Sequence, residues 1–195
     1  MKKIFNIIIG GVGGQGAITV GKILAEAAFL EKKEIKMSEL HGLSQRGGSV
    51  NVHLRIGEDM YSPLVGKEKA DLILILEKNE TFSNIDFISK SGETIFLIND
   101  FIIPSPASQN VKFENEEIKN LLKDFSKNVF IVPASKIAQE KFGNEAVSGV
   151  ILISFAAFKN LLPIKPTSIY KAIKKVIPKK YLELNLKAFN FAKTI

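Results

Sequence analysis

The sequence predicts a single α/β domain over residues 1–195, with helices on both faces of a mainly parallel β-sheet. Three observations support this prediction. Apolar runs of strand length alternate along the chain with stretches of helical periodicity. The first run, residues 4–9, leads directly into a glycine-rich segment and then into a helix. A length of 195 residues with 46% hydrophobic residues is enough for one buried core.

The first half of the chain contains three predicted strands and one helix. Residues 4–9 form a nearly unbroken apolar strand, and the helix that follows repeats apolar residues at the spacing of one buried face. Residues 34–38 are expected to form the second strand. Residues 50–56 alternate between apolar and polar side chains, which is typical of a half-buried strand. We therefore expect an antiparallel excursion over residues 49–64.

Two polar residues on this alternating strand, His53 and Arg55, lie off its apolar face. We assign both to a contact with another subunit.

The second half predicts further strands and a helical carboxyl-terminal part. Apolar runs at 71–76, 94–98 and 129–132 indicate buried strands, and the stretch from 144 onward is almost wholly helical, broken at prolines. Residues 147–158 contain no charge but are too few to span a bilayer, which takes about 20 residues. This helix is buried either within the domain or against a partner.

Composition excludes several classes of protein. The chain has no cysteine, which excludes a disulfide scaffold and any thiolate-ligated zinc or iron–sulfur centre within it. Two histidines, His41 and His53, are too few for a histidine-rich metal site. The apolar run near the amino terminus is shorter than the hydrophobic region of a signal peptide. We therefore expect a cytoplasmic protein.

The net charge of +7 comes from one part of the chain. Residues 159–195 contain nine lysines and a single acidic residue, Glu183, whereas the remainder is nearly neutral. These lysines are scattered along helical segments that contain no arginine, unlike the basic patches of nucleic-acid readers. A solvated helical face explains the pattern, and a surface for an anionic partner is the alternative.

The segment 11–16 has the G-x-G-x-x-G pattern between a strand and a helix. Glycines at these positions allow a tight turn and let a phosphate approach the amide groups at the positive end of the helix. An acid, Glu39, follows about 20 residues later, where a Rossmann-like dinucleotide fold holds a ribose hydroxyl. The pattern by itself would indicate NAD or FAD binding.

A second glycine-rich segment, residues 41–49, disfavours that interpretation. A dinucleotide fold continues from its second strand into a crossover helix, but this segment has too many glycines for a helix. Arg46 lies beside Gly47 and Gly48, so a permanent cation neighbours unhindered backbone amides. This combination suits a phosphate or a carboxylate. A plain hairpin connection with a solvent-facing arginine is the alternative.

Together these segments resemble a known family. Residues 11–16 (GVGGQG), 38–50 (SELHGLSQRGGSV), 52–57 (VHLRIG) and 61–64 (YSPL) closely resemble the small, or gamma, subunit of 2-oxoacid:ferredoxin oxidoreductases. The His-Gly-x-x-Gln-Arg-Gly-Gly-Ser form is similar to the β subunit of the indolepyruvate type. Strong matches cover residues 4–77, and the rest agrees in length and helical character.

The resemblance implies a subunit of an enzyme that converts a 2-oxoacid to an acyl-CoA and reduces ferredoxin, with indolepyruvate as the expected substrate. In such complexes thiamine diphosphate, Mg²⁺ and [4Fe-4S] clusters belong to a larger alpha subunit. This chain has neither the cysteines nor the Gly-Asp-Gly sequence for them, so none is held by this chain alone. Pyruvate, a branched-chain oxoacid or 2-oxoglutarate are the alternative substrates. Neither nucleic acid nor a membrane is an expected partner.

The resemblance and the residue pattern together give each candidate residue a role. The first loop and the following helix terminus are expected to cradle a phosphate of coenzyme A, and the second loop faces an active site shared with the large subunit. Arg46 is the expected catalytic residue, and His41 is either a proton carrier or an anchor of its loop. The expected coenzyme A-binding residues are Gly11, Gly13, Gly14, Gln15, Gly16, Thr19, Gln45, Gly47 and Gly48.

Two other functions remain open from the residues alone. A free-standing NAD- or FAD-binding protein would use Glu39 and the first loop, and it would bind its cofactor without a partner. A regulatory or nucleic-acid module would use the lysine-rich part, and its affinity would fall steeply with salt.

Overall fold

The computed structural model describes residues 4–41, 48–103 and 114–195. Its six-stranded sheet has the order β2-β3-β1-β4-β5-β6. These strands are β1 (Ile4–Val12), β2 (Ile35–His41), β3 (Ser49–Gly57), β4 (Leu72–Ile75), β5 (Ile95–Asn99) and β6 (Asn128–Val132). Strands β1, β4, β5 and β6 are parallel, and β3 runs antiparallel to both of its neighbours. The predicted mainly parallel α/β fold is confirmed.

The antiparallel excursion is confirmed for β3 and ends sooner than predicted. Strand β3 is inserted between β1 and β2, and because it opposes both, β2 runs in the same direction as β1. The segment 58–64 forms no strand. After Gly57 the chain instead folds back against β3, where the Ser62 carbonyl accepts a hydrogen bond from Arg55 and the Val65 N–H donates one to His53.

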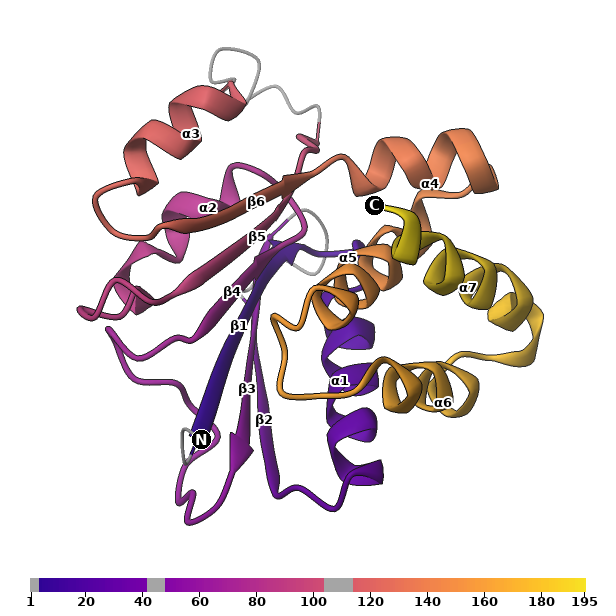
Figure 1. Ribbon diagram of the computed structural model, residues 1–195, viewed down its shortest axis with the longest axis horizontal. Helices are drawn as coiled ribbons and strands as arrows, with labels where there is room; N and C mark the ends of the chain where they lie inside the picture. The colour runs from indigo at the N-terminus through magenta and orange to yellow at the C-terminus, as the bar shows by residue number, and fades with distance from the viewer. Residues whose placement is uncertain (1–3, 42–47, 104–113) are drawn as a thin grey trace.

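Helices cover both faces of the sheet (Figure 1). One face carries α1 (Ala17–Leu30), α4 (Ala134–Phe142), α5 (Ser148–Phe158), α6 (Pro166–Val176) and α7 (Lys179–Phe191), and the other carries the short α2 (Glu80–Ser83) and α3 (Asn115–Leu122). Three short 3₁₀ helices complete the described part: Ile85–Phe87, Glu145–Val147 and Ala192–Thr194.

The sheet separates two hydrophobic cores, one on each of its faces. Ile7 and Ile9 of β1 pack into the core beneath α1 and α5, whereas Ile8 packs into the core beneath α3. Successive side chains of a strand point to opposite faces, so a strand covered on both sides must be apolar at every position. This requirement explains the continuous apolar runs in the sequence.

The uncharged helix α5 lies inside the domain. Its residues from Ser148 to Ala157 are all buried, and it contacts α1, α4, α6 and α7. Of the two placements left open by the sequence, burial within the domain is therefore confirmed. In the described part of the chain, no helix is both long enough and apolar enough to cross a membrane.

The assignment of His53 to a subunit contact is wrong. The residue is only 2% exposed, its Nδ1 accepts a hydrogen bond from the Val65 backbone N–H at 3.0 Å, and its ring meets the edge of Phe87. Arg55 is also engaged within the chain, because its guanidinium donates to Asn6 Oδ1 at 2.9 Å and to the Ser62 carbonyl at 2.8 Å. The fold-back after β3, which the period-two pattern does not show, covers His53 and accepts a hydrogen bond from the partly exposed Arg55.

Acidification is expected to destabilise the domain through His53. Burial lowers the pKa of His53, so the folded state favours the neutral ring while the unfolded chain takes up a proton near the ordinary value of 6.5. The stability that His53 contributes is therefore complete above that value and is lost as pH falls through the lowered pKa. Denaturant unfolding at about pH 8 and about pH 5 measures this loss. The His53→Gln variant should show a smaller loss, and an unchanged pH dependence would contradict the assignment.

Candidate functional site

The first glycine-rich loop joins β1 to α1 in a conformation that only glycine adopts easily. Gly14 and Gly16 have φ values of 104° and 85°, and a Cβ atom at either position would meet nothing within 4 Å. These positions are therefore glycine because of backbone strain rather than crowding. Gly16 is the N-cap of α1, and no side chain caps this helix end. The N–H groups of the first turn are thus left for water or a ligand.

The two polar side chains predicted for this loop have different environments. Gln15 Oε1 accepts a hydrogen bond from the Val12 N–H at 2.9 Å, and Gln15 Nε2 donates to the Leu76 carbonyl at 3.4 Å. Gln15 therefore ties its own loop to the end of β4, and Gly11 makes room for it, because a Cβ there would lie 3.1 Å from Oε1. Thr19 is exposed on the first turn of α1. A contact of either side chain with a ligand remains a prediction.

A cleft of about 750 Å³ lies against this loop. Its walls are the segment 13–16, the beginning of α5 with the residues before it, and the turn between α6 and α7. Glu145 is the one charged side chain among the described lining residues, and the interior is mainly apolar. A cleft of this size and character suits a ligand that combines apolar parts with an anionic group held by backbone N–H groups.

The second glycine-rich segment reaches the same rim of the sheet. The Gly13 N–H donates a hydrogen bond to the Gly48 carbonyl at 2.9 Å, and Ser49 pairs with Val12 where β3 begins. On the other side of the segment, β2 ends at His41, opposite Val50. The two glycine-rich segments therefore meet at one rim.

Three predicted site residues of the second segment, Gln45, Arg46 and Gly47, lie outside the described residues. Their roles, and the chemical role of His41, remain predictions. Gly48 is described, and its backbone joins the two segments.

Glu39 does not fit the dinucleotide interpretation. In a dinucleotide fold the second strand neighbours the first, so an acid at its tip reaches the ribose. Here β3 separates β2 from β1: Glu39 pairs with Val52, which pairs with Ile9. Two strand spacings place the Glu39 backbone about 10 Å from β1.

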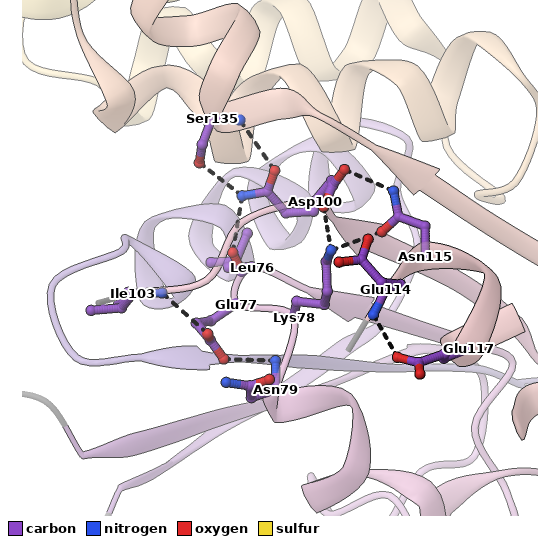
Figure 2. Close-up of polar contacts among 11 residues, drawn as sticks. Leu76, Glu77, Lys78, Asn79, Asp100, Ile103, Glu114, Asn115, Glu117 and Ser135 are labelled. Carbon is purple, nitrogen blue, oxygen red and sulfur yellow. Dashed lines mark hydrogen bonds and ion pairs between the residues drawn. The ribbon is translucent and has the colours of Figure 1, made fainter. Parts of the chain in front are cut away.

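A buried polar network supports the cleft wall that follows β5, and the sequence reasoning missed it (Figure 2). Glu77 is buried at the end of β4, and its carboxylate accepts hydrogen bonds from the N–H groups of Asn79 at 2.8 Å and Ile103 at 3.2 Å. Burial raises the pKa of Glu77. Because Ile103 lines the cleft, Glu77 fixes a wall of the site.

Lys78 joins the end of β4 to β5 and α3. Its ammonium group forms an ion pair with Asp100 and donates to Asn115 Oδ1 at 2.8 Å, while the Asn115 amide donates to Asp100 at 2.8 Å. The Lys78 N–H also donates to the carbonyl of Phe101, a lining residue. The sequence does contain a sign of this network: its charged residues come directly after two buried strands, at the edge of the sheet where α/β proteins bind ligands.

The described residues form no metal centre of their own. They contain no group of three or more histidine, cysteine, aspartate or glutamate side chains placed to hold a metal ion. With no cysteine in the sequence, the chain also lacks the thiolate ligands of an iron–sulfur cluster.

Comparison with known proteins places this geometry among oxidoreductase subunits. The family profile described as pyruvate ferredoxin/flavodoxin oxidoreductase matches residues 6–195. The chain is 36% identical over 184 residues to the indolepyruvate oxidoreductase subunit IorB of Archaeoglobus fulgidus, covering 94% of this chain and 90% of the relative. It is 30% identical to the pyruvate/ketoisovalerate oxidoreductases common subunit gamma of Pyrococcus abyssi, covering 91% of this chain and 89% of that subunit.

Two solved structures show the same fold. The pyruvate oxidoreductase subunit PORC of Thermotoga maritima has a TM-score of 0.71 at 20% identity, and the match covers 99% of this chain and 97% of that chain. The 2-oxoglutarate:ferredoxin oxidoreductase of Magnetococcus marinus, solved with 2-oxoglutarate, coenzyme A and succinyl-CoA bound, has a TM-score of 0.73 at 20% identity. That match covers all of this chain and 31% of the larger chain.

Proposed function

Because the chain belongs to the pyruvate ferredoxin/flavodoxin oxidoreductase family, we propose that it is the small subunit of an enzyme that oxidises indolepyruvate, with coenzyme A as the acyl acceptor and ferredoxin as the electron acceptor. The meeting of the two glycine-rich segments beside the cleft is the observation that carries this proposal. Relatives named as indolepyruvate oxidoreductase subunits at 34–36% identity favour indolepyruvate over other 2-oxoacids. A cytoplasmic location is part of the proposal.

The chain contributes binding rather than electron transfer. In the overall reaction the 2-oxoacid loses its carboxylate as CO₂, the acyl group is joined to the thiol of coenzyme A, and two electrons pass to ferredoxin with release of a proton. Thiamine diphosphate and iron–sulfur clusters in the large subunit would supply the carbanion and electron chemistry. The residues of this chain would bind the anionic part of coenzyme A at the first loop and orient its thiol toward the shared site.

Backbone geometry supports the binding role. The uncapped amino terminus of α1 presents N–H groups, and Gly14 and Gly16 leave the space beside them free of side chains. The hydrogen bonds that the Gln15 side chain and the Gly48 carbonyl accept from the loop hold it in one conformation before a ligand binds. A loop that is already ordered loses less entropy on binding.

Purification of the complex from its native source tests the proposal. We expect a companion chain with several Cys-x-x-Cys-x-x-Cys clusters and bound thiamine diphosphate, and a complex that turns over indolepyruvate faster than pyruvate or 2-oxoglutarate. Titration with coenzyme A, NAD and FAD provides the contrast, because a free-standing dinucleotide protein would bind NAD or FAD without a partner. Tight binding of either dinucleotide by this chain alone would overturn the proposal.

A further inference from the structure

Ser49, the last residue of the second glycine-rich segment, is anchored on the face of the sheet opposite the cleft. Val50 and Val52 of β3 pack into the core beneath α1, so Ser49 points toward the face that carries α2. There the Ser49 hydroxyl donates a hydrogen bond to Glu80 Oε2 at 2.6 Å. A hydrogen bond to a carboxylate is stronger than one between neutral groups. This contact therefore joins the beginning of β3 to α2.

The helix α2 is itself held in place over the end of β1. Asn84, which follows the helix, is fully buried and donates from Nδ2 to the Glu80 carbonyl at 2.8 Å. The same side chain lies directly on Gly10, where a Cβ atom would come within 2.6 Å of Asn84 Nδ2. Before the helix, the buried carboxylate of Glu77 accepts hydrogen bonds from the N–H groups of Asn79 at 2.8 Å and Glu80 at 3.2 Å. The Glu80 side chain therefore projects from a fixed backbone.

A further hydrogen bond extends this contact to the first glycine-rich loop. Ser49 follows Gly48, whose carbonyl accepts a hydrogen bond from the Gly13 N–H at 2.9 Å. Ser49 also pairs with Val12, the residue before Gly13, where β3 meets β1. Because Gly13 lines the cleft, a displacement of Ser49 is passed to the cleft through a single residue.

Glu77 connects the same helix to another wall of the cleft. Its Oε1 accepts a hydrogen bond from the N–H of the lining residue Ile103 at 3.2 Å, while its Oε2 holds the beginning of α2 (Figure 2). One continuous set of hydrogen bonds, passing through α2, therefore joins the wall at Ile103 to the loop at Gly13.

From this arrangement we propose that Ser49 and Glu80 are positioning residues, which hold the first glycine-rich loop in its binding conformation from the face of the sheet opposite the cleft. Neither residue lines the cleft, so both act through Gly48 and Gly13 rather than on a ligand. This inference rests on the proposed function, in which the first loop binds the anionic part of coenzyme A. A loop that is no longer held loses more entropy on binding, so removal of the contact weakens binding of coenzyme A.

Steady-state kinetics of the assembled complex test this role. Ser49→Ala and Glu80→Ala should each raise the KM for coenzyme A about threefold, the effect of one lost hydrogen bond at an exposed position, with kcat unchanged. The double variant should raise this KM no further than a single variant does, because both substitutions remove the same contact. Glu80→Gln keeps an acceptor oxygen and should have a lower KM than Glu80→Ala.

Asp86→Ala is the matched control. Asp86 lies in the 3₁₀ helix that follows α2, and its carboxylate forms an exposed contact with Lys67 at 2.7 Å. Neither residue of this pair lines the cleft, so the KM for coenzyme A should not change. A merely structural contribution of Ser49 or Glu80 would reduce the amount of active complex, and hence the apparent kcat, at an unchanged KM.

Four outcomes would overturn the inference: an unchanged KM for coenzyme A in either single variant, additive increases in the double variant, an equal increase in Asp86→Ala, or a Glu80→Gln complex as impaired as Glu80→Ala. Failure of the proposed function has a different signature. In that case the wild-type complex itself would show no turnover of a 2-oxoacid that depends on coenzyme A, and both proposals would fall.

Discussion

The Gly149→Val variant is expected to lose about 3 kcal/mol of unfolding free energy, because no space exists for its side chain. Gly149 lies where α5 crosses α1, and a Cβ atom there would lie only 2.6 Å from Val20 Cγ2. Val20 is buried and its methyl groups sit close to its backbone, so it cannot move aside without shifting α1. For a chain of this length the loss lowers the melting temperature by about 10 °C, which calorimetry measures.

Two companion variants separate crowding from other causes. Val20→Ala combined with Gly149→Ala removes the opposing methyl group and should restore much of the stability lost in Gly149→Ala alone. Gly66→Val is the control, since the nearest atom to a Cβ at that exposed position, Lys69 Cγ, is 3.6 Å away. A Gly149→Val protein as stable as the Gly66→Val control would contradict the close approach of the two helices. That approach matters for function because both helices begin at the cleft.

The Arg46→Ala variant is expected to lower kcat/KM of the assembled complex by about 10²–10³, the effect of removing one charged group that stabilises a developing anion. Arg46 lies outside the described residues, but both ends of its segment are fixed at the rim, by β2 at His41 and by the Gly48 carbonyl. The measurement is steady-state turnover of indolepyruvate, with subunit assembly checked by size-exclusion chromatography.

An Arg46→Lys variant serves as the matched control for this experiment. Lysine keeps the charge but lacks the planar fork of donors, so partial activity is expected if charge dominates. Unchanged kinetics in Arg46→Ala would remove this residue from the active site, and loss of assembly would instead place it in the subunit interface.

The sequence pattern was sufficient to predict the elements whose residues are apolar along their whole length. Residues 4–9 and 71–76 could be predicted as strands because a strand covered on both faces is apolar at every position. The sequence also predicts a helix over residues 134–142 that ends at Gly143. Helix α4 has these bounds, and Gly143 adopts the left-handed conformation that ends helices. The uncharged stretch near residue 150 could be predicted to be buried, but the sequence did not show which elements pack against it.

Contacts between segments that are far apart in the sequence could not be predicted from its periodicity. The fold-back of residues 60–65 over His53 depends on contacts between distant segments, and a polar residue on an alternating strand looks the same whether water or the chain covers it. The Glu77 and Lys78 network was missed for the same reason, because its partners Ile103 and Asp100 are fixed only when β5 lies beside β4. The meeting of the two glycine-rich segments was predictable, since both adjoin strand ends at one edge of the sheet.

The KM for coenzyme A in a complex carrying Gly16→Val tests the central claim most directly. A side chain at Gly16 would strain a φ of 85° and enter the space beside the uncapped end of α1. Gly92→Val, at a φ of 71° and outside the cleft lining, is the control for strain alone. We predict that Gly16→Val raises the KM for coenzyme A about tenfold, a loss typical of one or two hydrogen bonds to a charged group, while the KM for the 2-oxoacid is unchanged. An unchanged KM for coenzyme A, or the same increase in the Gly92→Val complex, would contradict the claim that the first loop holds this substrate.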